Sequence, residues 1–173
     1  MGDAVEVRHF VTGAKSHIAL AGPANKQGRI AADHICGRRS AYTGALGTSV
    51  LKLFDLTAAS TGLNEKQARA AGVAYDKVVT YSASHASYYP GARNMTVKTL
   101  FDPASGRILG AQIVGFDGVE KRMDVLAAAI RAGLTAEQLT ELDLAYAPPY
   151  GSAKDPVNMA GYVIENVRAG LVE

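Results

Sequence analysis

Apolar positions along the chain predict a mixed fold in which most of the strands come before most of the helices. Residues 95–101 and 107–115 are rich in β-branched and apolar side chains, and they flank Asp102-Pro-Ala-Ser-Gly106. That segment has the composition of a tight turn, so the two runs are predicted to form a β-hairpin. Shorter runs predict further strands, at 49–54, at 55–62 (a strand or a loop) and at 77–81.

Capping residues and apolar stripes predict the helices. Polar N-cap residues accept hydrogen bonds from a first turn, and glycine often ends a helix. The predicted helices are one from Gly22-Pro23 to Gly37, one over 65–71 capped by Asn64, one over 118–132 with Asp117 and Glu120 as a capping box, a short one with a capping box of Thr135 and Gln138, and one over 156–169 capped by Asp155. Strand–helix alternation of the βαβ kind is absent from this pattern. The predicted class is therefore α+β, an antiparallel sheet with helices packed on it.

Two short segments concentrate the tyrosines. Tyr146-Ala-Pro-Pro-Tyr150 contains adjacent prolines, which predict a stiff, extended connector ahead of the last helix. A proline turn with packing tyrosines is the alternative. The other segment, residues 82–91, is predicted to be a loop and contains His85, Tyr88 and Tyr89.

Composition narrows the class of protein. The 173 residues are 48% hydrophobic and 20% charged, as in a soluble globular protein. A net charge of +2 gives no argument for nucleic acid or an anionic membrane as a partner. The single cysteine excludes an internal disulfide and fits a reducing compartment, so the expected location is the cytoplasm. No apolar run approaches the roughly 20 residues of a membrane span.

The residues by themselves describe only part of a site. The four histidines share no ligand spacing, so no metal site is predicted, and His85 is interpreted as a solvated loop residue. Cys36 lies at the C-terminal end of a predicted helix, where the dipole disfavours a thiolate. The helix start at Gly22-Pro23 points backbone N–H groups at what lies ahead of it. It could hold an anion or a polarised carbonyl, or simply face water.

Four segments, taken together and in order, resemble the pyridine nucleotide–disulfide oxidoreductases. The resemblance is nearest to coenzyme A disulfide reductases, NADH oxidases and NADH-dependent persulfide reductases. It extends over the whole chain but covers only the C-terminal part of such an enzyme. The segments are Leu20–Asp33 (LAGPANKQGRIAAD), Gly47–Phe54 (GTSVLKLF), His85–Gly91 (HASYYPG), and Tyr146–Tyr150 (YAPPY) with Lys154–Gly161 (KDPVNMAG).

The resemblance implies a division of the chain into three parts. Residues 1–37 would be a C-terminal remnant of the FAD-binding domain, 38–46 a linker and 47–173 the dimerisation domain of an FAD- and NAD(P)H-dependent reductase. Met1 is then expected to be an added start, and the family's redox-active cysteine lies upstream and is not Cys36. The implied FAD-binding residues are Asp3, toward the ribityl chain, and Gly22, Pro23 and Ala24, facing the flavin ring. No cofactor is expected to bind to this chain alone.

The resemblance also implies a function for the tyrosines. In the family, loops of the dimerisation domain complete the active site of the partner subunit of a homodimer. The matching catalytic tyrosines are Tyr88 and Tyr146, with Tyr89 and Tyr150 as neighbouring alternatives. The expected substrate is coenzyme A disulfide, a persulfide or another small disulfide, and the chain alone is expected to be inactive. The alternatives are an NADH oxidase that reduces oxygen and a stand-alone dimerisation module. The choice between NADH and NADPH, and whether a rhodanese domain follows, stay open.

Overall fold

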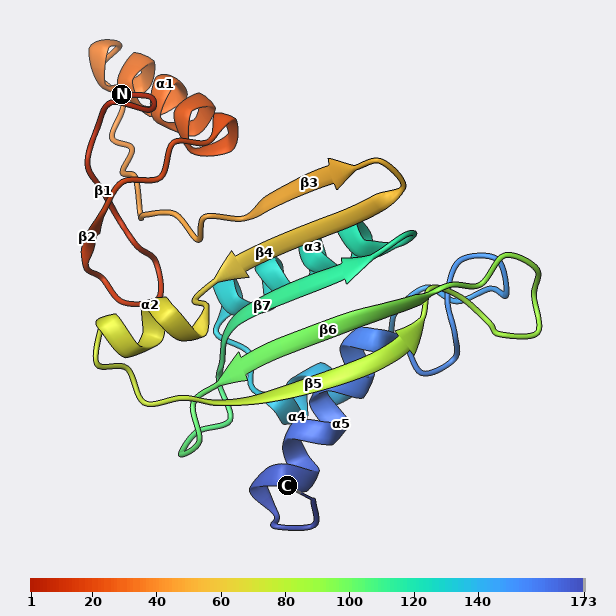
Figure 1. Ribbon diagram of the computed structural model, residues 1–173. Coiled ribbons are helices and arrows are strands. Elements are labelled where there is room, and N and C mark those ends of the chain that lie inside the picture. The colour runs from red at the N-terminus through yellow and green to blue at the C-terminus, as the bar shows by residue number, and fades with distance from the viewer. Residues whose placement is uncertain (173) are drawn as a thin grey trace.

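A five-stranded antiparallel sheet is the centre of the computed structural model, which describes residues 1–172 (Figure 1). The strands lie in the order β3-β4-β7-β6-β5. Their bounds are β3 Ser49–Leu53, β4 Leu56–Gly62, β5 Asp76–Ala83, β6 Asn94–Phe101 and β7 Ile108–Gly115. Helices cover one face of this sheet, so the predicted α+β class is confirmed.

The hairpin predicted between the two β-rich runs is present as β6 and β7. Thr99 pairs with Ala111, and Gly106 closes the turn by donating its N–H to the carbonyl of Asp102 at 2.8 Å. The Asp102 carboxylate accepts from the backbone N–H of Ser105, and this hydrogen bond lowers the pKa of Asp102. Residues 56–62, predicted as strand or loop, form a strand because they pair with β3 on one side and β7 on the other.

The core lies between the sheet and three helices, α3 (Val119–Ala132), α4 (Ala136–Thr140) and α5 (Pro156–Arg168). Ala59, Ile113 and Val97 lie in register on the face that the helices cover. Fully burying one large apolar side chain contributes about 1.5–3 kcal/mol, so this layer stabilises the domain. Its largest fully buried apolar side chains on the helices are Met123, Leu126, Ile130, Leu139 and Ile164.

Most of the predicted helix caps are confirmed. Asn64 and Gln67 form a reciprocal capping box for α2 (Glu65–Ala70), and Thr135 and Gln138 form one for α4. Asp155 caps α5 by accepting from the N–H of Val157 at 3.1 Å. The capping box predicted from Asp117 and Glu120 is wrong. Residue 118 at the N-cap of α3 is a glycine at φ 67°, so no side chain stands there to accept a hydrogen bond.

The first 35 residues form a smaller part beside the β3 edge of the sheet (Figure 1). It consists of the short strands β1 (Val7–Arg8) and β2 (Lys15–Ser16) and the helix α1 (Ala21–Ile35), close to the predicted helix. Within α1 as described, Gln27 is the one buried residue, and Ile35 is 87% exposed. None of the helices within residues 1–172 has both the length and the apolar character needed to span a membrane.

The Glu65 carboxylate links α2 to the sheet by ion pairs with lysines of two strands. Its carboxylate accepts from Lys98 on β6, from Lys77 on β5 at 2.9 Å and from Arg69 at 3.0 Å. The hydrogen bond from Lys98, followed by that from Lys77, lowers the pKa of Glu65 from 4.5 to about 2.

This depressed pKa predicts a pH-dependent contribution of Glu65 to stability. The contribution should be complete above pH 4.5 and should be lost as the pH falls toward about 2, because protonation removes the ionised form that the cations hold. Thermal unfolding should therefore give a Glu65→Gln variant a lower Tm than the wild type at pH 6, and the gap should close toward pH 2. Glu141→Gln, at a residue with no ion pair among the described residues, is the control. A gap that stays constant between pH 6 and pH 2 would contradict the assignment.

Candidate functional site

Two tyrosines that lie 58 residues apart in the sequence meet at one end of the sheet. Tyr88 belongs to the Tyr88 loop, residues 84–93 between β5 and β6, and Tyr146 belongs to the connector, residues 141–155 between α4 and α5. Their hydroxyl oxygens are 3.0 Å apart, a hydrogen-bonding distance. Tyr88 is 75% and Tyr146 47% exposed, so the pair faces outward.

The shared hydrogen bond gives the two phenols different roles. One hydroxyl donates its proton to the other, so the accepting tyrosine keeps its own proton free to donate elsewhere. The hydrogen bond with Tyr88 raises the pKa of Tyr146 above its ordinary value of 10. At neutral pH the Tyr146 hydroxyl therefore stays protonated and uncharged. It is suited to donate a hydrogen bond to a group that gains negative charge, and unsuited to act as a nucleophile.

His85 holds the Tyr88 loop from inside. Its Nδ1 lies 3.1 Å from the Ser84 hydroxyl and its Nε2 lies 3.2 Å from the carbonyl oxygen of Pro90. The Ser84 oxygen also accepts from the N–H of Arg93, which closes the base of the loop. His85 is only 6% exposed, so its interpretation as a solvated residue is wrong. Both ring nitrogens have partners within the loop, and the ring packs edge-on against Tyr89 at 5.8 Å.

The connector is held by a buried arginine. The two prolines lie in a turn rather than in a fully extended segment, because Tyr150 and Gly151 both donate their N–H groups to the carbonyl of Ala147. Arg122 donates to the carbonyl of Tyr150 at 3.4 Å and to the carboxylate of Asp155 at 2.9 Å. The predicted extended shape is therefore wrong at the two prolines, which form the alternative proline turn, and contacts to α3 hold that turn.

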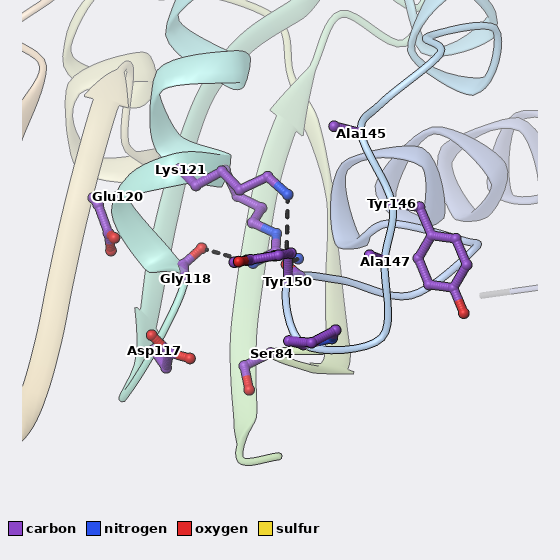
Figure 2. Close-up of a pocket in the computed structure, with 11 residues that line it drawn as sticks. Ser84, Asp117, Gly118, Glu120, Lys121, Ala145, Tyr146, Ala147 and Tyr150 are labelled. Atoms are coloured by element: carbon purple, nitrogen blue, oxygen red, sulfur yellow. Dashed lines mark hydrogen bonds between the residues drawn. The ribbon is translucent and has the colours of Figure 1, made fainter. Parts of the chain in front are cut away.

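A pocket of about 450 Å³ lies between α3 and the connector (Figure 2). Tyr150 lies beside Gly118 and Lys121, and the Lys121 ammonium is 3.5 Å from the Tyr150 carbonyl oxygen. The Tyr146 ring points to the other side of the connector. Among the described residues, the hydroxyls of Tyr89 and Tyr150 form no hydrogen bond comparable to that between Tyr88 and Tyr146. The two predicted tyrosines are therefore the pair that the fold brings together.

The predicted cofactor-binding residues lie elsewhere. The N–H of Gly2 donates to Gln27 at 2.9 Å, which places Asp3 beside α1. The Leu20 side chain does not cap α1, and the N–H of Ala24 donates to the Leu20 carbonyl. Figure 1 shows α1 beyond the β3 edge, whereas the Tyr88 loop and the connector extend from the other end of the sheet. Within one chain, therefore, the structure does not bring Asp3, Gly22, Pro23 or Ala24 to the tyrosines.

No arrangement of metal ligands is found in residues 1–172: no three His, Cys, Asp or Glu side chains are grouped so that they could hold an ion. Cys36 is exposed at the end of α1 and is a free thiol. The tyrosine pair is accordingly the main cluster of chemically useful side chains in the described part of the chain.

The comparisons with known proteins define the class. Residues 48–156 match the family described as pyridine nucleotide-disulphide oxidoreductase, dimerisation domain, and the chain belongs to that family. It is 37% identical over 163 residues to coenzyme A disulfide reductase from Staphylococcus haemolyticus, covering 94% of this chain. It is 36% identical over 164 residues to NAD(P)H coenzyme A polysulfide/persulfide reductase from Pyrococcus horikoshii, covering 95% of this chain. The chain spans 37% of the length of each of these two relatives.

Solved structures support the same class. The reduced CoADR-RHD of Bacillus anthracis superposes with a TM-score of 0.97 at 53% identity, covering 100% of this chain and 31% of that one. The NAD-dependent persulfide reductase of A. fulgidus gives a TM-score of 0.97 at 46% identity, covering 99% of this chain and 32% of that one. The water-forming NADH oxidase of Lactobacillus brevis, at 24% identity and a TM-score of 0.93, shares the fold.

The sequence pattern does not identify the ion pair that contacts the connector. It does not distinguish Arg122 from the other residues of the predicted helix, and it assigns Asp155 only the role of an N-cap. One signal for Arg122 exists in the sequence: it lies three residues after Val119 and four before Leu126, both buried positions of the α3 stripe. A charged residue on an apolar face needs a buried partner. Which residue would be that partner depends on the tertiary fold.

Proposed function

We propose that the chain is the dimerisation part of an FAD-dependent NAD(P)H:disulfide oxidoreductase whose substrate is a coenzyme A disulfide or persulfide. In this proposal Tyr88 and Tyr146 enter the active site of the partner subunit in a homodimer. The names of the relatives support the substrate class. The observation that carries the role of the tyrosines is the outward-facing hydrogen bond between their hydroxyls, 3.0 Å long.

The proposed role is to stabilise a departing sulfur. When the S–S bond of a disulfide is reduced by two electrons, both sulfurs reach the thiolate level, and the one that departs requires a proton or a hydrogen bond. A neutral phenol can donate to this sulfur without bringing its own charge close to the reactive centre. Because one hydroxyl accepts from the other, the outward donor is held in place by its neighbour. Such chains of hydrogen bonds also strengthen the outer donor.

The position of the pair favours action in the partner subunit. The first turn of α1, which the resemblance places at the flavin, lies at one end of the structure, and the Tyr88 loop and the connector lie at the other end (Figure 1). This separation within the chain supports a role of the tyrosines at the flavin site of the partner subunit. In a two-fold symmetric homodimer, residue i of one subunit contacts residue j of the other and the reverse, so such a dimer can place the tyrosines of each subunit at the flavin site of its partner.

The residues of α1 fit one edge of a flavin. The Leu20 side chain leaves the N-terminus uncapped, and a side chain built on Gly22 would meet no atom within 4 Å. The first hydrogen bond of the helix runs from the N–H of Ala24 to the carbonyl of Leu20. The N–H groups of Ala21 and Gly22 lie before it and have no acceptor within the helix. They can donate to a polar edge of the flavin ring, with Pro23 fixing the turn, and Asp3 would accept from the ribityl hydroxyls. FAD, when bound, would carry electrons from NAD(P)H to the disulfide.

We further propose the division into residues 1–37 from an FAD-binding domain, a linker over 38–46 and a dimerisation domain over 47–173. The matched family range, 48–156, lies within the last part and supports it. The single cysteine supports a reducing compartment such as the cytoplasm.

The purified chain provides a first test. We expect it to be dimeric, because it belongs to a dimerisation-domain family, and colourless, because residues 1–37 would supply only part of the FAD site. We also expect it to be inactive in NADH oxidation with any disulfide, because the resemblance places the redox-active cysteine outside its residues. Light scattering, the absorption spectrum and an NADH assay measure these three properties. A yellow protein with a bound flavin spectrum would contradict the proposal that a separate part of the enzyme supplies most of the FAD site.

A further inference from the structure

Arg122 is the most deeply buried charge in the described part of the chain that also has an ionic partner. Its side chain is 1% exposed and that of Asp155 is 5% exposed. The guanidinium donates through Nε and Nη2 to the Asp155 carboxylate, at 3.1 and 2.9 Å to the same oxygen. Taking two charges out of water is costly, and the pairing must be almost complete to offset that cost. Replacing such a pair with apolar residues is often neutral for stability, so stability alone does not explain the pair.

The other N–H groups of Arg122 donate to two backbone carbonyls, one in the connector and one beside the Tyr88 loop. Nη2 donates to the carbonyl of Tyr150 in the connector at 3.4 Å, four residues after Tyr146. Nη1 donates to the carbonyl of Gly118 at 3.1 Å. Gly118 lies beside the base of the Tyr88 loop, because a Cβ built on it would be 3.8 Å from the carbonyl oxygen of Ser84. One side chain thus touches the connector and a residue that packs on the other loop.

A direct hydrogen bond links the two loops. The N–H of Ala86, two residues before Tyr88, donates to the carbonyl of Pro148, two residues after Tyr146, at 3.3 Å. Asp155 also holds the end of the connector, because the oxygen that caps α5 belongs to the carboxylate that Arg122 binds. Loss of the ion pair should therefore make the connector more mobile on the C-terminal side of Tyr146. Because Ala86 is hydrogen-bonded to Pro148, the Tyr88 loop should become more mobile as well.

We propose that Arg122, through its ion pair with Asp155, is a positioning residue that holds the Tyr88 and Tyr146 hydroxyls at hydrogen-bonding distance. The proposal rests on the proposed function, in which this phenol pair donates to the departing sulfur. The guanidinium is suited to the task because its planar fork fixes direction as well as distance, which an ammonium does not.

The experiment measures the phenol pair in the full 173-residue chain with ring-labelled tyrosine. NMR reports the contact between the Tyr88 and Tyr146 rings and the pH at which Tyr146 titrates. In Arg122→Lys, which keeps the charge but loses the fork, the contact should weaken several-fold and the titration of Tyr146 should move down toward that of an ordinary tyrosine. Signals of Tyr42 and Tyr75, which lie outside both loops, should be unchanged.

Asp155→Asn is the second variant, and it carries the test if Arg122→Lys does not fold. Asparagine keeps an oxygen to cap α5 and removes only the charge. Arg168→Gln is the matched control, because it breaks the ion pair with Glu137 at the other end of α5 and touches neither tyrosine loop. The control should keep the wild-type contact and titration.

A purely structural role gives a different result. Variants that fold with a lower Tm but keep the ring contact and the Tyr146 titration would overturn the proposal. A separate experiment tests the proposed function. If that function is wrong, Tyr88→Phe and Tyr146→Phe will leave disulfide reduction in the intact enzyme unchanged. That outcome would not alter the NMR result for Arg122.

Discussion

Replacing either Tyr88 or Tyr146 with phenylalanine in the intact oxidoreductase should slow disulfide reduction about 10- to 100-fold, the effect of losing one hydrogen bond to a charged group worth about 1.5–3 kcal/mol. Phenylalanine keeps the ring and removes only the hydroxyl. Reduction of the flavin by NADH should be unchanged, because it precedes the step in which sulfur departs. Rapid-mixing kinetics separate these two half-reactions. Equal rates of disulfide reduction in the variants and the wild type would reject the tyrosine assignment.

The double variant tests whether the two hydroxyls act as one unit. Each single change breaks the same 3.0 Å hydrogen bond, so the combined loss in rate should be smaller than the product of the two single losses. Tyr81→Phe is the control, since Tyr81 is 76% exposed on β5 and lies outside both loops. Tyr89→Phe and Tyr150→Phe distinguish the neighbouring tyrosines, whose hydroxyls are outside the pair. A large effect of either would move the assignment to that residue.

The sheet and most helix ends were predictable because local chemistry decides them. The turn at Asp102–Gly106 identified the hairpin, and Asn64, Thr135 and Asp155 identified three helix starts through caps that the structure confirms. The exception is instructive. Asp117 and Glu120 have the spacing of a capping box, but Gly118 begins α3 in a left-handed conformation, and its carbonyl binds Arg122. Gly118, and not Asp117, therefore stands at the N-cap, and it has no side chain that could accept from the first turn.

The candidate site was predictable in its residue types but not in its geometry. Only the family resemblance points to Tyr88 and Tyr146, because nothing in a spacing of 58 residues indicates a contact. The burial of His85 could not be predicted either, because its partners are a neighbouring hydroxyl and the carbonyl of Pro90, which come together only when the loop closes. The same holds for Arg122 and Asp155, which meet across α3 and α5.

Mixed dimers test most directly whether the tyrosines act in the partner subunit. One subunit of the intact enzyme carries Tyr88→Phe and Tyr146→Phe with its redox-active cysteine intact, and the other carries a serine in place of that cysteine with both tyrosines intact. Each parent homodimer should be slow or inactive. If the tyrosines act across the two-fold axis, every mixed dimer contains one complete site. Random exchange of equal amounts should then restore about a quarter of the wild-type rate of disulfide reduction, because about half the dimers are mixed and each has one working site of two. No recovery after verified exchange would show that the tyrosines act within their own subunit and would contradict the proposed function.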